Sequence, residues 1–187
     1  MVAIQELVLL GLLKDGPKHG YEIKKQIHDI MNRFAVWEAQ SIYYPLQMME
    51  KNGYVTKHSA RSGKRPEKFI YEITDLGQAR FNELLDESFT TIQRPTFNID
   101  LSLYFLQFMK SAEALQRLNL RLRILRKIER GLEKLETTAR GNYPYNHLAI
   151  IDHNIELIKA EIKFTSEFIH TFTKAVKKPS RNSKQIK

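Results

Sequence analysis

The chain of 187 residues contains no cysteine, and it has only eight glycines and six prolines. Without cysteine it can form no disulfide bond and can use no thiolate in catalysis. It also lacks a long apolar run, because the longest, Leu7 to Leu13, is about a third of the roughly 20 residues that span a membrane. No basic segment precedes that run, so a secretory signal peptide is not expected. These absences favour a globular protein of the cytoplasm with no membrane partner.

Signals for catalysis and for cofactor or metal binding are missing as well. The six histidines are scattered without an i, i+4 pair, so no metal site is predicted. No G-x-S-x-G, P-loop or G-x-G-x-x-G motif occurs, and the carboxylates are spread evenly along the chain. We therefore expect neither an enzyme nor a cofactor.

Basic residues are in excess, with a net charge of +9, but the excess is uneven. Residues 1–92 contain 12 Lys/Arg and 12 Asp/Glu, whereas residues 177–187 contain five basic residues and no acidic one. We expect residues 177–187 to form a disordered basic tail. A local cluster is better evidence for a nucleic-acid partner than the total charge. Residues 51–68 hold such a cluster: Lys51, Lys57, Arg61, Lys64, Arg65 and Lys68 against a single acid, Glu67.

Hydrophobic spacing in the first half predicts helices followed by a hairpin. Residues 3–13 are apolar on nearly every side, which requires burial on more than one face. Two more helices, two strands and a fourth helix, N-capped by Thr74, are predicted at 19–33, 39–52, 54–58, 69–73 and 75–91. This order describes a winged helix-turn-helix, so residues 1–92 are predicted to form a DNA-binding domain.

In such a domain the third helix reads bases and the hairpin contacts the DNA backbone. Ile42, Leu46 and Met49 form the inward stripe of that helix, which leaves its polar residues facing outward. The predicted DNA contacts are Gln40, Ser41, Tyr44, Gln47 and Lys51 on the helix and Lys64, Arg65 and Lys68 on the wing. Two alternatives stay open: a merely solvated polar face, and a winged helix that binds proteins without binding DNA.

The second half is predicted to be helical beyond a boundary at residues 93–96, with helices at about 100–109, 111–139 and 146–175. Apolar residues of the last helix recur in steps of three and four, as in a heptad seam. The seam is either a core stripe within one chain or a dimer interface, and the thin core of residues 93–176 favours dimerisation. The predicted interface comprises Leu148, Ile151, Ile155, Ile158, Ile162, Ile169 and Phe172, together with Leu7 of the apolar first helix. The predicted fold class is thus mainly α with a small β-hairpin.

Several segments of the first half form motifs in a fixed order: residues 9–23, 40–43, 46, 49–55, 63–66 and 71–77. In this order they resemble the PadR family of bacterial transcriptional regulators. Residues 9–23 are similar to the family's first helix and the start of its second. Residues 40–43, 46 and 49–55 are similar to its recognition helix and first strand, and residues 63–66 and 71–77 to its wing, second strand and closing helix. The family usually has Tyr-Pro where this chain has Tyr43-Tyr44, and here Pro45 comes one place later, inside the predicted helix.

The resemblance implies a homodimeric repressor of the larger subfamily, whose helical C-terminal domain dimerises and whose members respond to small molecules such as phenolic acids. By position it implies DNA contacts by Tyr21, Ser41, Tyr43, Lys64 and Arg65. The expected partners are a palindromic double-stranded operator and a small aromatic effector. Five aromatic residues either line a pocket for such an effector or pack in the core: Phe34, Trp37, Tyr104, Phe105 and Phe108.

Overall fold

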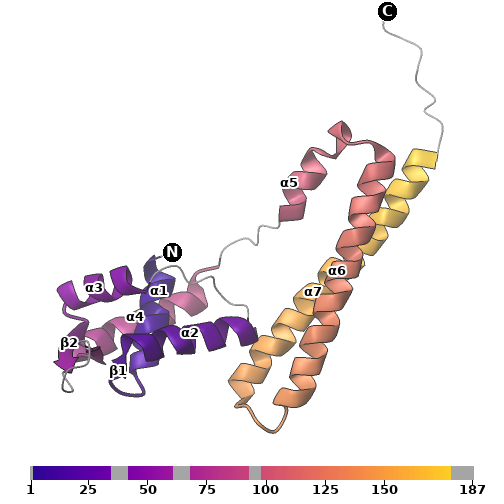
Figure 1. The fold of residues 1–187 in the computed structure, drawn as a ribbon. Helices are drawn as coiled ribbons and strands as arrows, with labels where there is room; N and C mark the ends of the chain where they lie inside the picture. The colour runs from indigo at the N-terminus through magenta and orange to yellow at the C-terminus, as the bar shows by residue number, and fades with distance from the viewer. Residues whose placement is uncertain (1, 35–41, 61–67, 93–97, 178–187) are drawn as a thin grey trace, which may run out of the picture. The chain divides into compact units, whose positions relative to one another are not determined.

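The computed structural model of the protein describes residues 2–34, 42–60, 68–92 and 98–177. The chain divides into two compact units, Met1–Arg94 and Pro95–Lys187 (Figure 1). The first unit combines helices with a three-stranded antiparallel sheet, and the described part of the second is helical. The predicted fold class, mainly α with a small β-hairpin, is confirmed. Within the described residues, no helix is long and apolar enough to cross a membrane.

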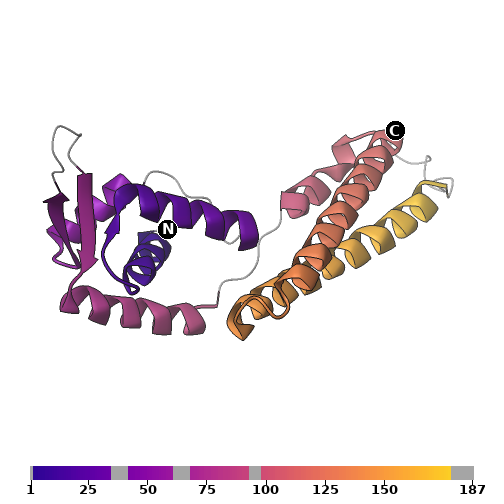
Figure 2. The same ribbon diagram turned by 60° about the horizontal axis from the view of Figure 1, so that its bottom comes forward.

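Four helices and three short strands form the first unit. In chain order they are α1 (Val2–Leu13), β1 (Lys18–His19), α2 (Gly20–Phe34), α3 (Tyr43–Lys51), β2 (Val55–Ala60), β3 (Lys68–Ile73) and α4 (Asp75–Thr90). The strand order is β1-β3-β2, and Figure 2 shows β2 and β3 side by side as the long strands of the sheet. Strand β1 was not predicted, and it exists because Lys18 and His19 pair with Tyr71 and Ile70.

Helix α1 lies at the centre of the first unit. It contacts α2, α3, α4 and β3, which explains why its sequence is apolar on nearly every side. Leu9, Leu10 and Leu13 are at most 1% exposed, and they share a core with Ile23 and Ile27 of α2 and with Leu46 and Met49 of α3. Leu7 packs against the same core, so part of its surface is covered before any second copy binds.

The end of α3 and the start of α4 are joined by a close network around Thr74. The Thr74 hydroxyl accepts a hydrogen bond from the Gly77 backbone N–H at 3.0 Å and donates one to the Gly53 carbonyl at 2.7 Å. The first of these bonds is the predicted helix N-cap. The backbone N–H of Thr74 donates to the carbonyl of Tyr54 at 3.1 Å. These bonds fix where the sheet and α4 begin relative to α3.

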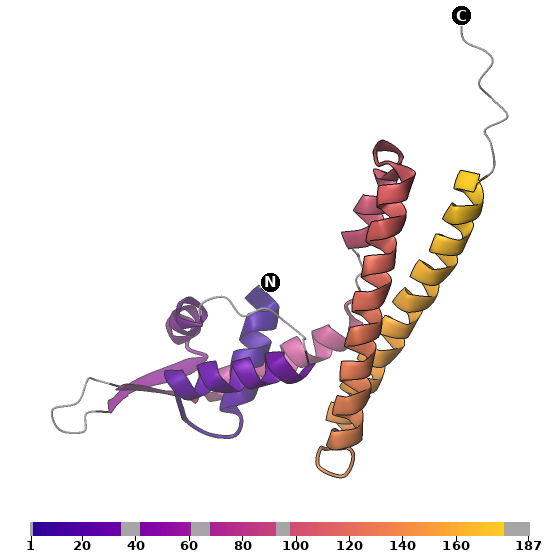
Figure 3. The same ribbon diagram turned by 45° about the vertical axis from the view of Figure 1, so that its right-hand side comes forward.

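The second unit contains α5 (Asn98–Tyr104), a 3-10 turn (Leu106–Phe108), α6 (Ser111–Ala139) and α7 (Tyr145–Lys177). Helices α6 and α7 pack along one another as an antiparallel hairpin, seen from two sides in Figures 1 and 3. An ion pair links them, since Arg121 Nη2 lies 2.6 Å from Glu161 Oε2. The predicted tail lies outside the described residues except for Lys177, which ends α7.

The heptad seam on α7 is used in part within a single chain. Ile151 and Ile155 are 1% and 5% exposed, so these two positions form a core stripe of the α6–α7 hairpin. The remaining predicted interface positions on this helix are only half-buried: Leu148, Ile158, Ile162, Ile169 and Phe172. Ile151 and Ile155 thus fit a core stripe within one chain, and the half-buried positions fit a dimer interface. The dimer contacts stay a prediction.

Candidate nucleic-acid interface

Helix α3 presents one polar face to the outside. Tyr43 and Tyr44 are 57% and 68% exposed, and Gln47 and Lys51 are exposed as well. At 100° per residue these four side chains fall within about a third of a turn, on the side away from the buried Leu46 and Met49. This face offers two phenol groups, an amide and an ammonium group over less than three helical turns. Such groups hydrogen bond base edges and phosphates when a helix lies in a major groove.

The start of α3 differs from the prediction. The helix begins at Tyr43 after an N-cap at Ile42, not at residue 39. Pro45 is therefore the third helical residue, where a backbone N–H has no partner within the helix anyway. The first helical hydrogen bond runs from the Leu46 N–H to the Ile42 carbonyl at 3.1 Å. The shift from Tyr-Pro to Tyr-Tyr-Pro is thus accommodated in the first turn, and it leaves Tyr44 on the outward face.

The start of α2 carries a second group of polar residues. Glu22 accepts a hydrogen bond from the His19 backbone N–H at 2.7 Å, as the acidic residue of a capping box does. That bond lowers the pKa of the Glu22 carboxyl, so this group stays ionised at neutral pH. Its negative charge raises the pKa of Tyr21, whose hydroxyl lies 3.3 Å from it. The exposed Tyr21 phenol therefore remains protonated at neutral pH, and its ring stacks on His19 at 5.6 Å.

The first turn of α2 lies within van der Waals reach of α3 at Gly20. A Cβ atom at this position would lie 3.6 Å from the Tyr43 ring and 3.6 Å from the Tyr71 ring. The Tyr43 ring thus rests against the first turn of α2, beside Tyr21. The structure in this way brings two of the predicted DNA-contact residues, one from each helix, onto one surface of the first unit.

Strands β2 and β3 form the base of the wing. They pair in register from Val55 opposite Ile73 to Ala60 opposite Lys68, so Lys68 begins β3 as part of this ladder. One contact on it was not predicted: the Lys57 ammonium lies 3.9 Å above the exposed Phe69 ring. Residue 57 lies diagonally across the ladder from 69, a position at which long and aromatic side chains meet, so the strand register was the signal. This cation extends the basic character of the wing toward its base.

Several predicted residues lie outside what the structure describes. They are Gln40 and Ser41 before α3, Lys64 and Arg65 of the wing tip, and Trp37; the side chains of Lys68 and Phe34 are also not described. Tyr104, Phe105 and Phe108 are 76%, 54% and 80% exposed, so none of them packs in a core of the single chain. Among the described residues, no cluster of His, Asp and Glu is suited to hold a metal ion.

Four helices and a three-stranded antiparallel sheet, with a hairpin that follows the third helix, define the first unit as a winged helix-turn-helix domain. Residues 9–83 match the model of the transcriptional regulator PadR-like family. The first unit is thus similar to the PadR-like family of transcriptional regulators over residues 9–83.

Individual relatives show the same likeness. The chain is 24% identical over 111 residues to the negative transcriptional regulator PadR of Bacillus subtilis, covering 59% of this chain. The match spans 61% of that relative's length. The solved structure of Bacillus subtilis PadR in complex with operator DNA matches with a TM-score of 0.74 at 19% identity, over 90% of this chain and 99% of that one. The complex of the same protein with p-coumaric acid matches with a TM-score of 0.72 at 17% identity, over 92% and 97%. At these identities the two solved structures establish the fold.

Proposed function

We propose that the protein is a sequence-specific DNA-binding transcriptional regulator that acts on chromosomal DNA in the cytoplasm. The observation that carries this proposal is the outward face of α3, where Tyr43, Tyr44, Gln47 and Lys51 stand exposed on a winged-helix scaffold. In that fold this face enters the major groove, and Tyr21 at the start of α2 reaches the adjoining phosphates. Gln40 and Ser41 stay proposed contacts just ahead of the helix.

The wing supplies the second proposed contact. The basic residues Lys64, Arg65 and Lys68 follow β2, whose Lys57 is held over Phe69. Cations on such a hairpin neutralise phosphates and release the counterions that had been condensed on the DNA. The wing is therefore proposed to add affinity for any DNA sequence, whereas α3 adds the discrimination.

Removal of the wing charges tests this proposal. The double variant Lys64→Ala/Arg65→Ala is expected to bind all DNA sequences more weakly and to flatten the plot of log K against log salt by about one to two units of slope. Fluorescence anisotropy at several salt concentrations measures both effects. The double variant Lys127→Ala/Lys134→Ala, which removes two exposed cations from α6, is the matched control. An unchanged salt slope in the wing variant would show that Lys64 and Arg65 do not contact phosphates.

We further propose a homodimer that pairs through the second unit. The half-buried seam positions on α7 support it, and so does a stripe on α6 that was not predicted, formed by Leu120, Ile124 and Ile128 at 41%, 51% and 44% exposure. Stripes of this kind on a helical hairpin are typical of helix pairing between chains. A two-fold dimer would present two α3 helices to a palindromic operator.

A charge placed in the exposed stripe tests the dimer. Ile124→Glu is expected to weaken self-association about tenfold or more, because pairing would bury the new carboxylate without a partner. Ile124 is half-exposed, so the hairpin of one chain can tolerate the change. Arg126→Glu lies about 200° farther around the same helix and serves as the control. Analytical ultracentrifugation gives the masses, and an unchanged dimer in the Ile124 variant would place the interface elsewhere.

The direction of regulation is also a proposal. A relative is named a negative regulator, and one of the similar structures holds p-coumaric acid. We propose by this likeness that the present protein is a repressor that a small aromatic effector releases. Such an effector changes DNA affinity only if it binds one arrangement of the dimer better than another.

A further inference from the structure

Helix α6 carries a row of exposed cations on one side. At 100° per residue they fall within about 100° of the helix circumference, opposite the buried Leu118 and Leu125. The row runs for about 16 Å along the helix, and within Arg123–Lys134 no acidic or apolar residue falls in the same sector. We call this side the basic face, and it consists of Arg123, Arg126, Lys127, Arg130 and Lys134.

The charges of the basic face are not balanced within the second unit. Among the residues that the structure describes, none of the five cations takes part in an ion pair. The acids of the same stretch, Glu129 and Glu133, have another partner on α7. There the pKa of Lys159 is raised by its bond to Glu156 and also by the charges of Glu133 and Glu129. The basic face is therefore left with a surplus of positive charge.

The cations of the basic face also repel one another. Three pairs lie one helical turn apart: Arg123 with Lys127, and Arg130 with both Arg126 and Lys134. Like charges at i, i+4 destabilise a helix, and solvent-exposed helices typically alternate the two signs instead. An anion bound along the face would relieve this repulsion, so the arrangement favours a partner with many negative charges.

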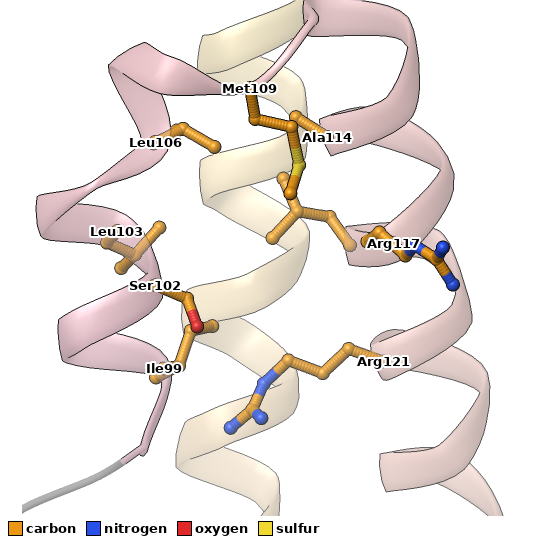
Figure 4. A pocket seen from close by; sticks show the side chains of 9 residues that line it. Ile99, Ser102, Leu103, Leu106, Met109, Ala114, Arg117 and Arg121 are labelled. Carbon is orange, nitrogen blue, oxygen red and sulfur yellow. The ribbon is translucent and has the colours of Figure 1, made fainter.

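Not every cation of α6 lies on the basic face. Arg121 lines a pocket of about 350 Å³ between α5 and the first turns of α6 (Figure 4). Its side chain extends toward Ser102 of α5 in that view, and its Nη2 atom lies 2.6 Å from Glu161 Oε2 on α7. This arginine is thus used in the packing of the second unit, whereas the cations on the opposite side of the helix are not.

The composition of the basic face favours duplex DNA as the partner. Three of its five cations are arginines, whose planar fork matches a phosphate group. A protein partner would need apolar or aromatic residues at the centre of the interface, and a single-stranded nucleic acid would need aromatic rings for its bases to stack on. The face has neither. Over a length of about 16 Å one strand of a DNA duplex presents about five phosphates.

We propose that the basic face of α6 binds the phosphate backbone of double-stranded DNA outside the operator that α3 reads. The inference rests on the proposed function because it takes DNA as the partner, and it gives the second unit a DNA contact of its own. The face lies about 100° around α6 from the stripe of Leu120, Ile124 and Ile128, so it stays accessible in the proposed dimer. Contacts to phosphates add affinity without discriminating between sequences.

Fluorescence anisotropy of the full-length protein on two duplexes tests this contact. The short duplex carries only the inverted repeat selected from a random library, about 20 base pairs, and the long one extends it by about 20 random base pairs on each side. The wild type is expected to bind the long duplex about tenfold more tightly and with a steeper dependence on salt. Arg123→Gln/Arg130→Gln is expected to lose this gain and to flatten the salt slope on the long duplex by about two units.

The short duplex supplies the internal control. There Arg123→Gln/Arg130→Gln is expected to bind as the wild type does, which shows that the reading helix and the dimer are intact. Lys127→Ala/Lys134→Ala likewise leaves the salt slope on the short duplex unchanged, as its use as the control for the wing requires. Lys163→Gln/Lys174→Gln removes two exposed cations from α7 and should keep the gain on the long duplex.

Two results would overturn the proposal. One is a gain from duplex length that survives in Arg123→Gln/Arg130→Gln, which would leave an acidic protein as the partner of the basic face. The other is a salt slope that this variant flattens equally on both duplexes. If the wild type binds the short duplex no better than a random duplex of the same length, sequence reading by α3 fails, and the long duplex still decides on the basic face.

A second labelled duplex of random sequence distinguishes the two sources of the bound DNA. A gain on the long duplex places the contact on the flanks of the same DNA molecule. If the complex with the short duplex instead recruits the second duplex, and if Arg123→Gln/Arg130→Gln abolishes the recruitment, the basic face binds a separate DNA molecule. Absence of both effects in the wild type would contradict the proposal.

Discussion

Gly77→Ala is expected to lower the free energy of unfolding of the first unit by about 3 kcal/mol, at the upper end of overpacking effects. A Cβ atom at this position would lie 2.0 Å from the Tyr54 carbonyl oxygen and 2.9 Å from Cγ1 of Ile73. The Tyr54 oxygen cannot move away freely, because it accepts the Thr74 backbone N–H at 3.1 Å in the turn that joins the sheet to α4. The first turn of α4 would have to shift, and the network around Thr74 would loosen with it.

Gly131 provides the matched control for this change. It also lies within a helix, α6, but a Cβ atom there would meet nothing within 4 Å. Gly131→Ala is therefore expected to stabilise the protein by about 0.5–1 kcal/mol, because alanine loses less conformational freedom in a helix than glycine does. Urea unfolding followed by circular dichroism measures both variants. If Gly77→Ala had the same urea midpoint of unfolding as the wild type, the close approach of α4 to Tyr54 would be contradicted.

Gln47→Ala is expected to weaken binding to the operator by about 1–3 kcal/mol, which corresponds to roughly a five- to 150-fold rise in Kd. The reason is that an exposed glutamine amide on this face of α3 can make a bidentate contact with adenine, and alanine can make none. Binding to random DNA is expected to stay nearly unchanged. Gln47 makes no contribution to the buried stripe of α3, so the fold should be retained.

The losses of affinity on operator DNA and on random DNA are compared, because the comparison distinguishes a base contact from a phosphate contact. Tyr44→Ala should behave as Gln47→Ala if Tyr44 reads a base, and it should weaken both DNAs alike if its hydroxyl contacts a phosphate. Gln116→Ala removes an exposed amide from α6 and is expected to change neither affinity. Equal losses on both DNAs for Gln47→Ala would show that this residue does not read sequence.

The fold was largely predictable because its elements carry strong local signals. The cap at Thr74 and the heptad spacing on α7 are local in sequence, and both elements appear where they were expected. Strand β1 was missed because two residues have no periodicity, and only pairing with β3 defines them. The start of α3 was misplaced because the polar residues before Ile42 fit a helix or a loop equally well.

The candidate site was less predictable, since spacing does not specify a partner. A seam such as that of Ile151 and Ile155 has the same sequence whether it packs on α6 or on a second chain. The stripe at Leu120, Ile124 and Ile128 became visible only once the packed side of α6 was known. The pocket beside Arg121 depends on how α5 folds back on α6, which no local pattern encodes.

Helix α3 of the winged helix is proposed to read a specific DNA sequence as part of a two-fold dimer. Selection of bound sequences from a random double-stranded DNA library by the full-length protein tests it most directly. An inverted repeat is expected to be enriched, with half-sites about 10 base pairs apart or a multiple of that, and the enrichment is expected to be lost with Gln47→Ala. If no sequence is enriched, or if the protein binds no DNA at low salt, sequence reading by α3 is contradicted. Either result would favour a winged helix that binds proteins.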